Sequence, residues 1–252
     1  MDCEFSESQY MNAFNLEFVP LMKKKGWNSF EIPTQIKEKK LGYDTSIKGP
    51  FSAVFLQFKV PRYLYKKNAK YIADNTYISP YFEMKIWPHT ISPQHNLLIK
   101  LAQIPSNHVY YCTPKFTTQN KFDKYFANDT IGTNSLLIPC KNLPLIQGNV
   151  KHVITYTDLN NKFIMHSDPF SSYSAPLHLI VSEIITGETY HEMDSFIHII
   201  SDILGIKWEN KTNDEKLASI TDILFFTFNI QLIILEKPNS KDVYEFNNYS
   251  TF

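Results

Sequence analysis

The chain has 252 residues, 43% of them hydrophobic, which is enough to bury the core of one large domain or of a domain with an appendage. Lys and Arg together number 25, as do Asp and Glu, which excludes the global basic field of many nucleic-acid-binding proteins. Three cysteines without a Cys-x-x-Cys pair argue against a thiolate zinc site and fit a reducing compartment. The sequence has neither an apolar N-terminal run nor a membrane-spanning run, so we expect a cytoplasmic protein.

Two helices are predicted at the start of the chain. Helical spacing of apolar residues predicts the first from Ser6 to about Lys25, with Ser6 and Gln9 as a capping box. A shorter helix is predicted over residues 33–40, because Pro suits its first turn and Gly its C-terminal cap. The second helix carries Glu38.

A strand covered on both faces is predicted over residues 54–60. Large apolar residues occur on both of its faces, where Gln57 and Lys59 share one face by the period of two. We therefore expect both polar side chains to be shielded from water, where an ammonium needs a partner. Gly49 and Pro50 predict a hairpin that brings Asp44 beside Gln57.

Residues 61–80 interleave basic and aromatic side chains. The basic residues are Arg62, Lys66, Lys67 and Lys70, and the aromatic residues are Tyr63, Tyr65, Tyr71 and Tyr77. Because cations neutralise phosphate and aromatic rings stack on bases, this segment is the best candidate for contact with nucleic acid. The alternative is an ordinary loop and short helix with lysines that extend into solvent.

The rest of the chain alternates strands and helices and then becomes mainly helical. Strands are predicted over 81–87, 108–114, 135–139, 150–157, 162–166 and 231–235, and helices over 92–102, 118–126, 177–185, 193–204 and 217–228. We expect an α/β domain over residues 1–170 and a mainly helical C-terminal extension, packed on it, over 171–252.

Two further motifs are rejected. His166-Ser167-Asp168 lacks a nucleophile elbow, and a catalytic triad is assembled by the fold, so these residues are read as a turn. His191-Glu192 lacks the second His that a zinc protease needs four residues after the first.

The pattern of an acid in a helix, an acid after a turn and Gln-x-Lys in a strand resembles the PD-(D/E)XK nucleases, the restriction-endonuclease-like superfamily. The resemblance covers roughly residues 30–105. Tyr43 stands where the family name has proline, and Gln57 where most members have an acid, as in a minority Gln-x-Lys branch. The resemblance implies a restriction-endonuclease-like core of helix, three strands, helix and strand.

The resemblance also implies a site. Asp44 and the carbonyl oxygen of Gln57 would hold Mg²⁺ or Mn²⁺, with Glu38 as a further direct or water-mediated ligand. Lys59 would orient or deprotonate the attacking water, and Gln94 would point into the site from the helix after the third strand. A Gln in place of an acid implies weaker metal binding unless Glu38 compensates.

The implied function is hydrolysis of phosphodiester bonds, in DNA rather than RNA, by an effector of a bacterial defence or restriction system. The alternative is a catalytically degenerate subunit that binds nucleic acid or protein in a larger complex, which the neutral net charge favours. A third interpretation is a cytosolic protein in which the pattern from Glu38 to Lys59 is accidental. A protein partner or a homodimer is compatible with these roles, and no membrane partner is expected.

Overall fold

The computed structural model describes residues 1–25, 27–31, 49–73, 76–77, 80–166, 170–187 and 189–237. Glu38 and Asp44 lie outside these residues, as do Ser167 and Asp168. The fold is mixed α/β, as the sequence predicts. Among the described residues, none of the helices combines the length and apolar character that crossing a membrane requires.

Most of the described helices begin and end within two residues of the predicted ranges. The helix predicted over 217–228, however, begins at Asn213 and gives way to a π-helical turn after Asp222, and the helix predicted over 33–40 lies outside the described residues. The described helices are α1 (Glu7–Lys24), α3 (Lys70–Ala73), α4 (Gln94–Ala102), α5 (Gln119–Ala127), α6 (Leu177–Thr186), α7 (Met193–Leu204) and α8 (Asn213–Asp222), with a 3-10 turn over Cys140–Asn142 and a π-helical turn over Ile223–Thr227. The predicted capping box of α1 is confirmed, since Ser6 N donates to Gln9 Oε1 (2.9 Å) and Gln9 N to Ser6 Oγ (3.1 Å). Helix α7 ends at Gly205, whose positive φ of 69° a glycine adopts without strain.

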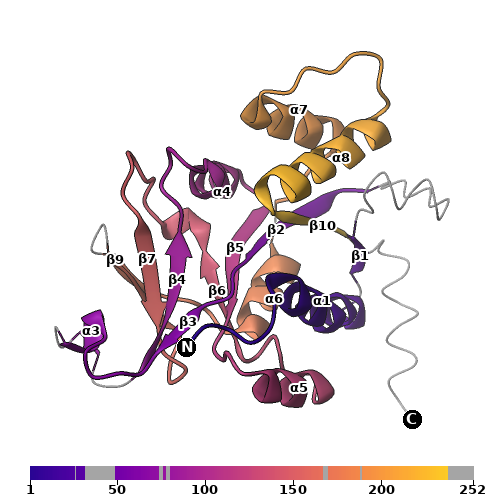
Figure 1. Ribbon diagram of the computed structural model, residues 1–252. Helices are drawn as coiled ribbons and strands as arrows, with labels where there is room; N and C mark the ends of the chain where they lie inside the picture. The colour runs from indigo at the N-terminus through magenta and orange to yellow at the C-terminus, as the bar shows by residue number, and fades with distance from the viewer. Residues whose placement is uncertain are drawn as a thin grey trace, which may run out of the picture. The chain divides into compact units, whose positions relative to one another are not determined.

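Ten described strands form two five-stranded sheets (Figure 1). The mixed sheet has the order β1 (Asn28–Glu31), β10 (Gln231–Glu236), β2 (Phe51–Phe58), β5 (Asn107–Pro114) and β6 (Ser135–Pro139). The antiparallel sheet has the order β3 (Arg62–Leu64), β4 (Tyr81–Ile86), β7 (His152–Tyr156), β8 (Lys162–Met165) and β9 (Phe170–Tyr173).

Strand β2 has a parallel and an antiparallel neighbour. Ala53 N donates to Ser106 O and Lys59 N to Cys112 O, so the bonds advance by the same number of residues on β2 and β5, which therefore run in one direction. On the other edge β10 pairs antiparallel, from Phe51↔Glu236 to Leu56↔Gln231. All eight residues of β2 are buried, which confirms the prediction of a strand covered on both faces.

The predicted third strand, β4, pairs with β3 and β7 and belongs to the antiparallel sheet. The position beside β2 is taken by β10, which comes from the predicted C-terminal extension. This arrangement establishes a mixed α/β protein and does not by itself identify a restriction-endonuclease-like core.

One compact unit consists of Met1–Phe18, Gln57–Ile99 and Tyr110–Ile180. Its core contains an aromatic cluster between α1 and β2, in which the rings of Tyr10 and Phe14 each lie 5.6 Å from that of Phe58. Buried Tyr10 also donates a hydrogen bond of 2.6 Å to Ser135 Oγ. The cluster anchors the end of β2, from which the candidate site continues.

The second compact unit consists of Val19–Leu56, Lys100–Val109 and Val181–Phe252. In its core Phe51 packs against Phe196, with ring centroids 5.2 Å apart, and His191 lies beside both. Each unit gathers three separate stretches of chain, so neither coincides with the predicted range 1–170 or 171–252.

Candidate nucleic-acid interface

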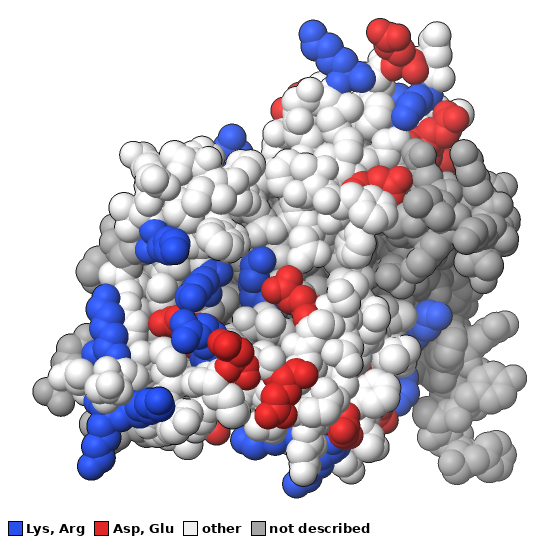
Figure 2. All heavy atoms as spheres, in the orientation of Figure 1, with Lys and Arg blue, Asp and Glu red and all other residues white. Residues whose placement is uncertain are grey.

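The basic and aromatic segment after β2 is built on β3, a turn and α3. Strand β3 pairs with β4, with Arg62 opposite Glu83 and Tyr63 opposite Phe82. A turn closed by Ala69 N donating to Lys66 O (2.8 Å) leads into α3. Lys66, Lys67 and Lys70 are exposed, and Figure 2 shows Lys and Arg side chains gathered over β3 and α3. The segment therefore presents cations on the surface, as predicted.

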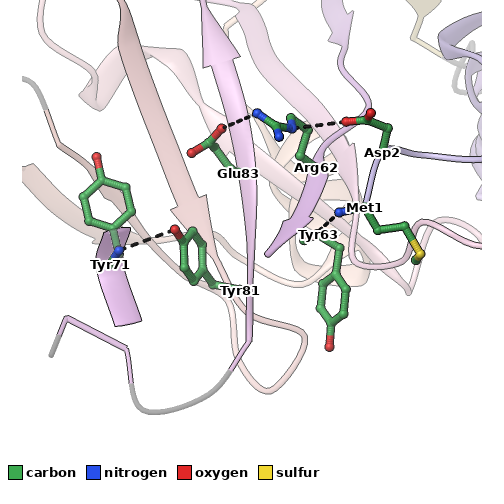
Figure 3. Close-up of polar contacts among 7 residues, drawn as sticks. All are labelled: Met1, Asp2, Arg62, Tyr63, Tyr71, Tyr81 and Glu83. Atoms are coloured by element: carbon green, nitrogen blue, oxygen red, sulfur yellow. Dashed lines mark hydrogen bonds and ion pairs between the residues drawn. The ribbon is translucent and has the colours of Figure 1, made fainter. Parts of the chain in front are cut away.

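Arg62 lies between two carboxylates (Figure 3). Its Nε is 3.1 Å from Asp2 Oδ1, and its Nη1 is 3.8 Å from Glu83 Oε1. These pairs neutralise part of its charge, although its side chain is 46% exposed. Arg62 is consequently a weaker phosphate contact than the lysines that follow it in the chain.

The four tyrosines of the segment have different environments. Tyr65 is 54% exposed, and its ring stacks on that of Tyr63 with centroids 6.2 Å apart. Tyr71 is buried and stacks on His166 at 3.6 Å, and Tyr77 stacks on Tyr81 at 5.1 Å. Tyr71 is thus a core residue, and Tyr63 and Tyr65 are the tyrosines placed to meet a ligand.

A pocket of about 270 Å³ opens at this segment. Its lining residues are Met1, Arg62, Tyr63, Leu64, Tyr65, Lys66, Asn68 and Ala69. The Met1 amino group donates to Tyr63 O at 2.7 Å, which fixes the start of the chain against β3 (Figure 3). Aromatic rings beside cations suit a planar base that carries a phosphate. No pattern in the sequence could have predicted Met1 here, because its contact is with a distant part of the chain.

No family model matches this chain, and neither a curated protein nor a solved structure matches it.

Two of the predicted catalytic residues lie at the end of β2. Gln57 is fully buried, and its Nε2 donates to Phe58 O at 3.1 Å. Its Oε1 is buried without a hydrogen-bond partner among the described residues. Lys59 is half-buried, and no ion pair joins it to another residue in the described part of the chain. The predicted shielding from water is confirmed for Gln57 and is partial for Lys59.

A metal site cannot be assembled from the described residues alone. In the part of the chain that the structure covers, no three His, Cys, Asp or Glu side chains form a group that could hold a metal ion. Glu38 and Asp44 lie outside that part, so their meeting with Gln57 and Lys59 stays a prediction. Gln57 fits one requirement, since a buried amide oxygen without a partner is the donor type that Mg²⁺ accepts.

Gln94 begins α4 beside a structural histidine. Its backbone N donates to Ser92 Oγ at 3.4 Å, as expected for a cap, and its side chain is half-buried. His95 is buried, with Nδ1 2.9 Å from Tyr111 OH and Nε2 2.9 Å from Pro144 O. Burial lowers the pKa of His95 and favours its neutral form, and both of its ring nitrogens have partners within the protein. No hydrogen bond in the described part of the chain joins Gln94 to Gln57 or Lys59.

A polar network that the sequence did not reveal supports α3. His166 Nε2 lies 2.7 Å from Thr155 Oγ1, and Tyr77 OH lies 2.9 Å from the same oxygen. Thr155 is fully buried, so its hydroxyl is not accessible as a nucleophile. Together with the stacking of Tyr71 on His166, this network attaches α3 and Tyr77 to Thr155 of β7 and to His166 after β8.

Proposed function

We propose that this protein binds nucleic acid through the β3–α3 surface, which consists of Tyr63, Tyr65, Lys66, Lys67 and Lys70. The proposal is carried by one observation. Residues 59–70 contain five basic and no acidic residues; three of the lysines are exposed, and one of them, Lys66, lines a pocket together with the stacked Tyr63 and Tyr65.

Single-stranded nucleic acid fits this surface best. Exposed lysines neutralise phosphates without fixing a sequence, and an exposed aromatic ring stacks on a base only where that base is unpaired. DNA is the first substrate to test, because the nucleases that the sequence resembles act on it. The neutral net charge means that attraction depends on this local surface.

The test measures fluorescence anisotropy of labelled single-stranded and double-stranded DNA, and of single-stranded RNA, at several salt concentrations. The variant Lys66→Ala/Lys67→Ala should bind single strands more weakly, with a slope of log affinity against log salt that is shallower by about 0.7 for each lost phosphate contact. The matched control is Lys121→Ala/Lys124→Ala, which removes two exposed lysines from α5. Equal loss in both double variants, or loss in neither, would overturn the proposal.

Metal-dependent cleavage of the bound strand is the second candidate. It is favoured by the buried side-chain oxygen of Gln57, which has no hydrogen-bond partner among the residues that the structure describes, and by Lys59, two residues further along the chain. Glu38, Asp44 and Gln57 would hold Mg²⁺ or Mn²⁺, which supplies Lewis-acid stabilisation of the phosphate. Lys59 would position the attacking water and offset charge on the phosphate. A nuclease of this kind would suit an effector in a bacterial defence or restriction system.

A plasmid and oligonucleotide degradation assay with Mg²⁺ or Mn²⁺ separates the candidates. Wild type is compared with Lys59→Ala and Asp44→Ala, and binding is measured in parallel. Cleavage that both substitutions abolish, with binding retained, supports the nuclease. Binding without cleavage supports a degenerate module in a larger complex, and cleavage that neither substitution reduces places the catalytic site elsewhere.

A further inference from the structure

Two loops project side by side at one end of the antiparallel sheet, beyond the end of β4 and the start of β7 (Figure 1). Thr90 Oγ1 in the first loop donates to Asn149 Oδ1 in the second at 2.9 Å. Asn96 at the start of α4 bonds both the N–H and the carbonyl of Ile146, at 3.0 and 2.9 Å. These bonds hold the two loops together as one tip of the sheet.

This tip exposes four large apolar side chains, here named the tip cluster. They are Trp87 (52% exposed), Ile91 (60%), Leu145 (52%) and Val150 (60%). Ile91 and Val150 directly follow the bonded pair Thr90 and Asn149 in the chain, so they belong to the same tip. Exposed apolar side chains gathered at one place mark an interaction surface, whereas single ones need no explanation.

The two loops of the tip carry no acidic residue. Residues 84–122 and 130–157, which contain both loops, have no Asp or Glu, although acidic and basic residues balance over the whole chain. The acid of β4, Glu83, lies three residues before the end of that strand and is paired with Arg62. Lys85 and Lys151 are exposed at this end of the sheet. The last pair of β4 and β7 is Ile86↔His152; Trp87 directly follows Ile86, and Lys151 directly precedes His152. Over the loops Figure 2 shows an uncharged surface whose nearest charged side chains are blue.

We propose that the tip cluster docks on an anionic lipid surface. The four apolar side chains enter the boundary between headgroups and acyl chains, and Lys85 and Lys151 face the lipid phosphates. Three of the four side chains are aliphatic, which favours hydrocarbon over nucleic acid, because only an aromatic ring stacks on a base. The absence of acids complements the negative charge of such a surface. Docking of this kind requires no membrane-spanning helix.

Tryptophan fluorescence tests the proposal with the whole chain. Trp87 is 52% exposed, whereas Trp27 is 3% exposed and Trp208 is half-buried, with its Nε1 donating to Ser201 Oγ at 2.6 Å. Trp87 is therefore the residue whose emission should shift to the blue on entering lipid, and Trp87→Phe separates its signal from those of the other two. The shift and co-sedimentation should appear with vesicles of phosphatidylcholine and phosphatidylglycerol, should be much weaker with phosphatidylcholine alone, and should fall as salt rises. Trp87→Phe should lose the shift and retain most of the sedimentation.

Two comparisons of variants distinguish docking of the tip cluster on lipid from non-specific adsorption of the protein to vesicles. Ile91→Ser/Val150→Ser should abolish sedimentation with the anionic vesicles, whereas Leu159→Ser, which replaces a side chain that is 79% exposed in the β7–β8 turn, should not. Lys85→Ala/Lys151→Ala should weaken vesicle binding roughly five-fold for each lysine, and Lys162→Ala should have no such effect.

Several results would overturn the proposal. One is the absence of both shift and sedimentation with anionic vesicles, and another is equal binding by wild type and Ile91→Ser/Val150→Ser. A shift that depends on protein concentration without vesicles would assign the tip cluster to contact with a second copy. A change in Trp87 emission on adding single-stranded DNA, without a response to vesicles, would assign it to nucleic acid.

Discussion

The ring of Tyr63 stacks on that of Tyr65, with centroids 6.2 Å apart and ring planes 26° from parallel. The ring of Tyr63 also packs against that of Phe82, with centroids 5.0 Å apart, whereas Tyr65 is 54% exposed. In this pair the Tyr63 ring is packed against its neighbour and the Tyr65 ring is open to solvent. Such an arrangement can receive an unpaired base at little cost in conformational entropy.

Tyr65→Ala should weaken binding of single-stranded DNA without loss of stability. Stacking of one base on an aromatic side chain contributes about 1–3 kcal/mol, so affinity should fall roughly 5- to 150-fold. Tyr173→Ala, which removes another well-exposed tyrosine, is the control for fluorescence anisotropy. Unchanged affinity in Tyr65→Ala would show that the strand binds without this ring.

Substitutions of Gln57 should distinguish a structural side chain from a metal ligand. Gln57→Met replaces a buried oxygen that lacks a described partner by an apolar chain of similar size, so urea denaturation should show an unfolding free energy equal to or up to about 1 kcal/mol above that of wild type. Gln57→Glu should be less stable, because a carboxylate is then buried.

The metal arm of the same experiment is a stability measurement. If Gln57 lies at a cation site, added Mg²⁺ should stabilise Gln57→Glu more than wild type, because binding to the folded state alone raises the unfolding free energy. Stabilisation by Mg²⁺ that is equal in Gln57→Glu, Gln57→Met and wild type would remove Gln57 from the metal site.

Tyr156→Phe should destabilise the protein by about 1–3 kcal/mol. Tyr156 OH lies 2.6 Å from Thr113 Oγ1 and donates to Pro114 O at 2.9 Å, and both Tyr156 and Thr113 are fully buried. Removing the hydroxyl leaves two buried polar groups without this partner. Thermal or urea unfolding measures the effect, and Tyr173→Phe, at an exposed position, should be neutral.

Stability should fall as the pH is lowered from about 6.5 towards 4, and His191 should contribute to the fall. Burial, with a smaller effect of His108, lowers the pKa of His191 from 6.5 to about 4, and its Nε2 lies 2.7 Å from Asn107 Oδ1. The unfolded chain binds the proton more readily in this window, so the neutral histidine stabilises the fold fully above pH 6.5, and roughly 1–3 kcal/mol is lost on acidification.

Urea denaturation at pH 7 and pH 5 checks this expectation. His191→Gln should reduce the difference in unfolding free energy between the two pH values, and some difference should remain because burial also lowers the pKa of His95. The control is His198→Gln, at an exposed position on α7. An undiminished pH difference in His191→Gln would contradict the assignment.

Local elements were predicted well because their signals lie within a few residues. Reciprocal bonds between Ser6 and Gln9 start α1, and β6 spans Ser135–Pro139, the same range as the predicted strand. The burial of β2 followed from apolar residues on both of its faces. Caps and periodicity act over one or two turns, so they can be read without knowledge of the fold.

The sequence predicts the segment that forms the candidate interface, but not which of its side chains are exposed. Residues 61–80 interleave basic residues with tyrosines, yet Tyr71 is buried against His166 and Arg62 is paired with Asp2 and Glu83. Those partners are distant in sequence, so no local pattern distinguishes an exposed tyrosine from a buried one.

By itself, then, the sequence determined the local elements, the burial of β2 and the cluster of bases that follows it. Only the tertiary structure decided that β10, from the end of the chain, pairs with β2 while β4 joins another sheet. It also decided that the loops at Thr90 and Asn149 meet. The physical reason is that strand partners and loop contacts are chosen by non-local burial and hydrogen bonding, whose free energy depends on segments far apart in the chain.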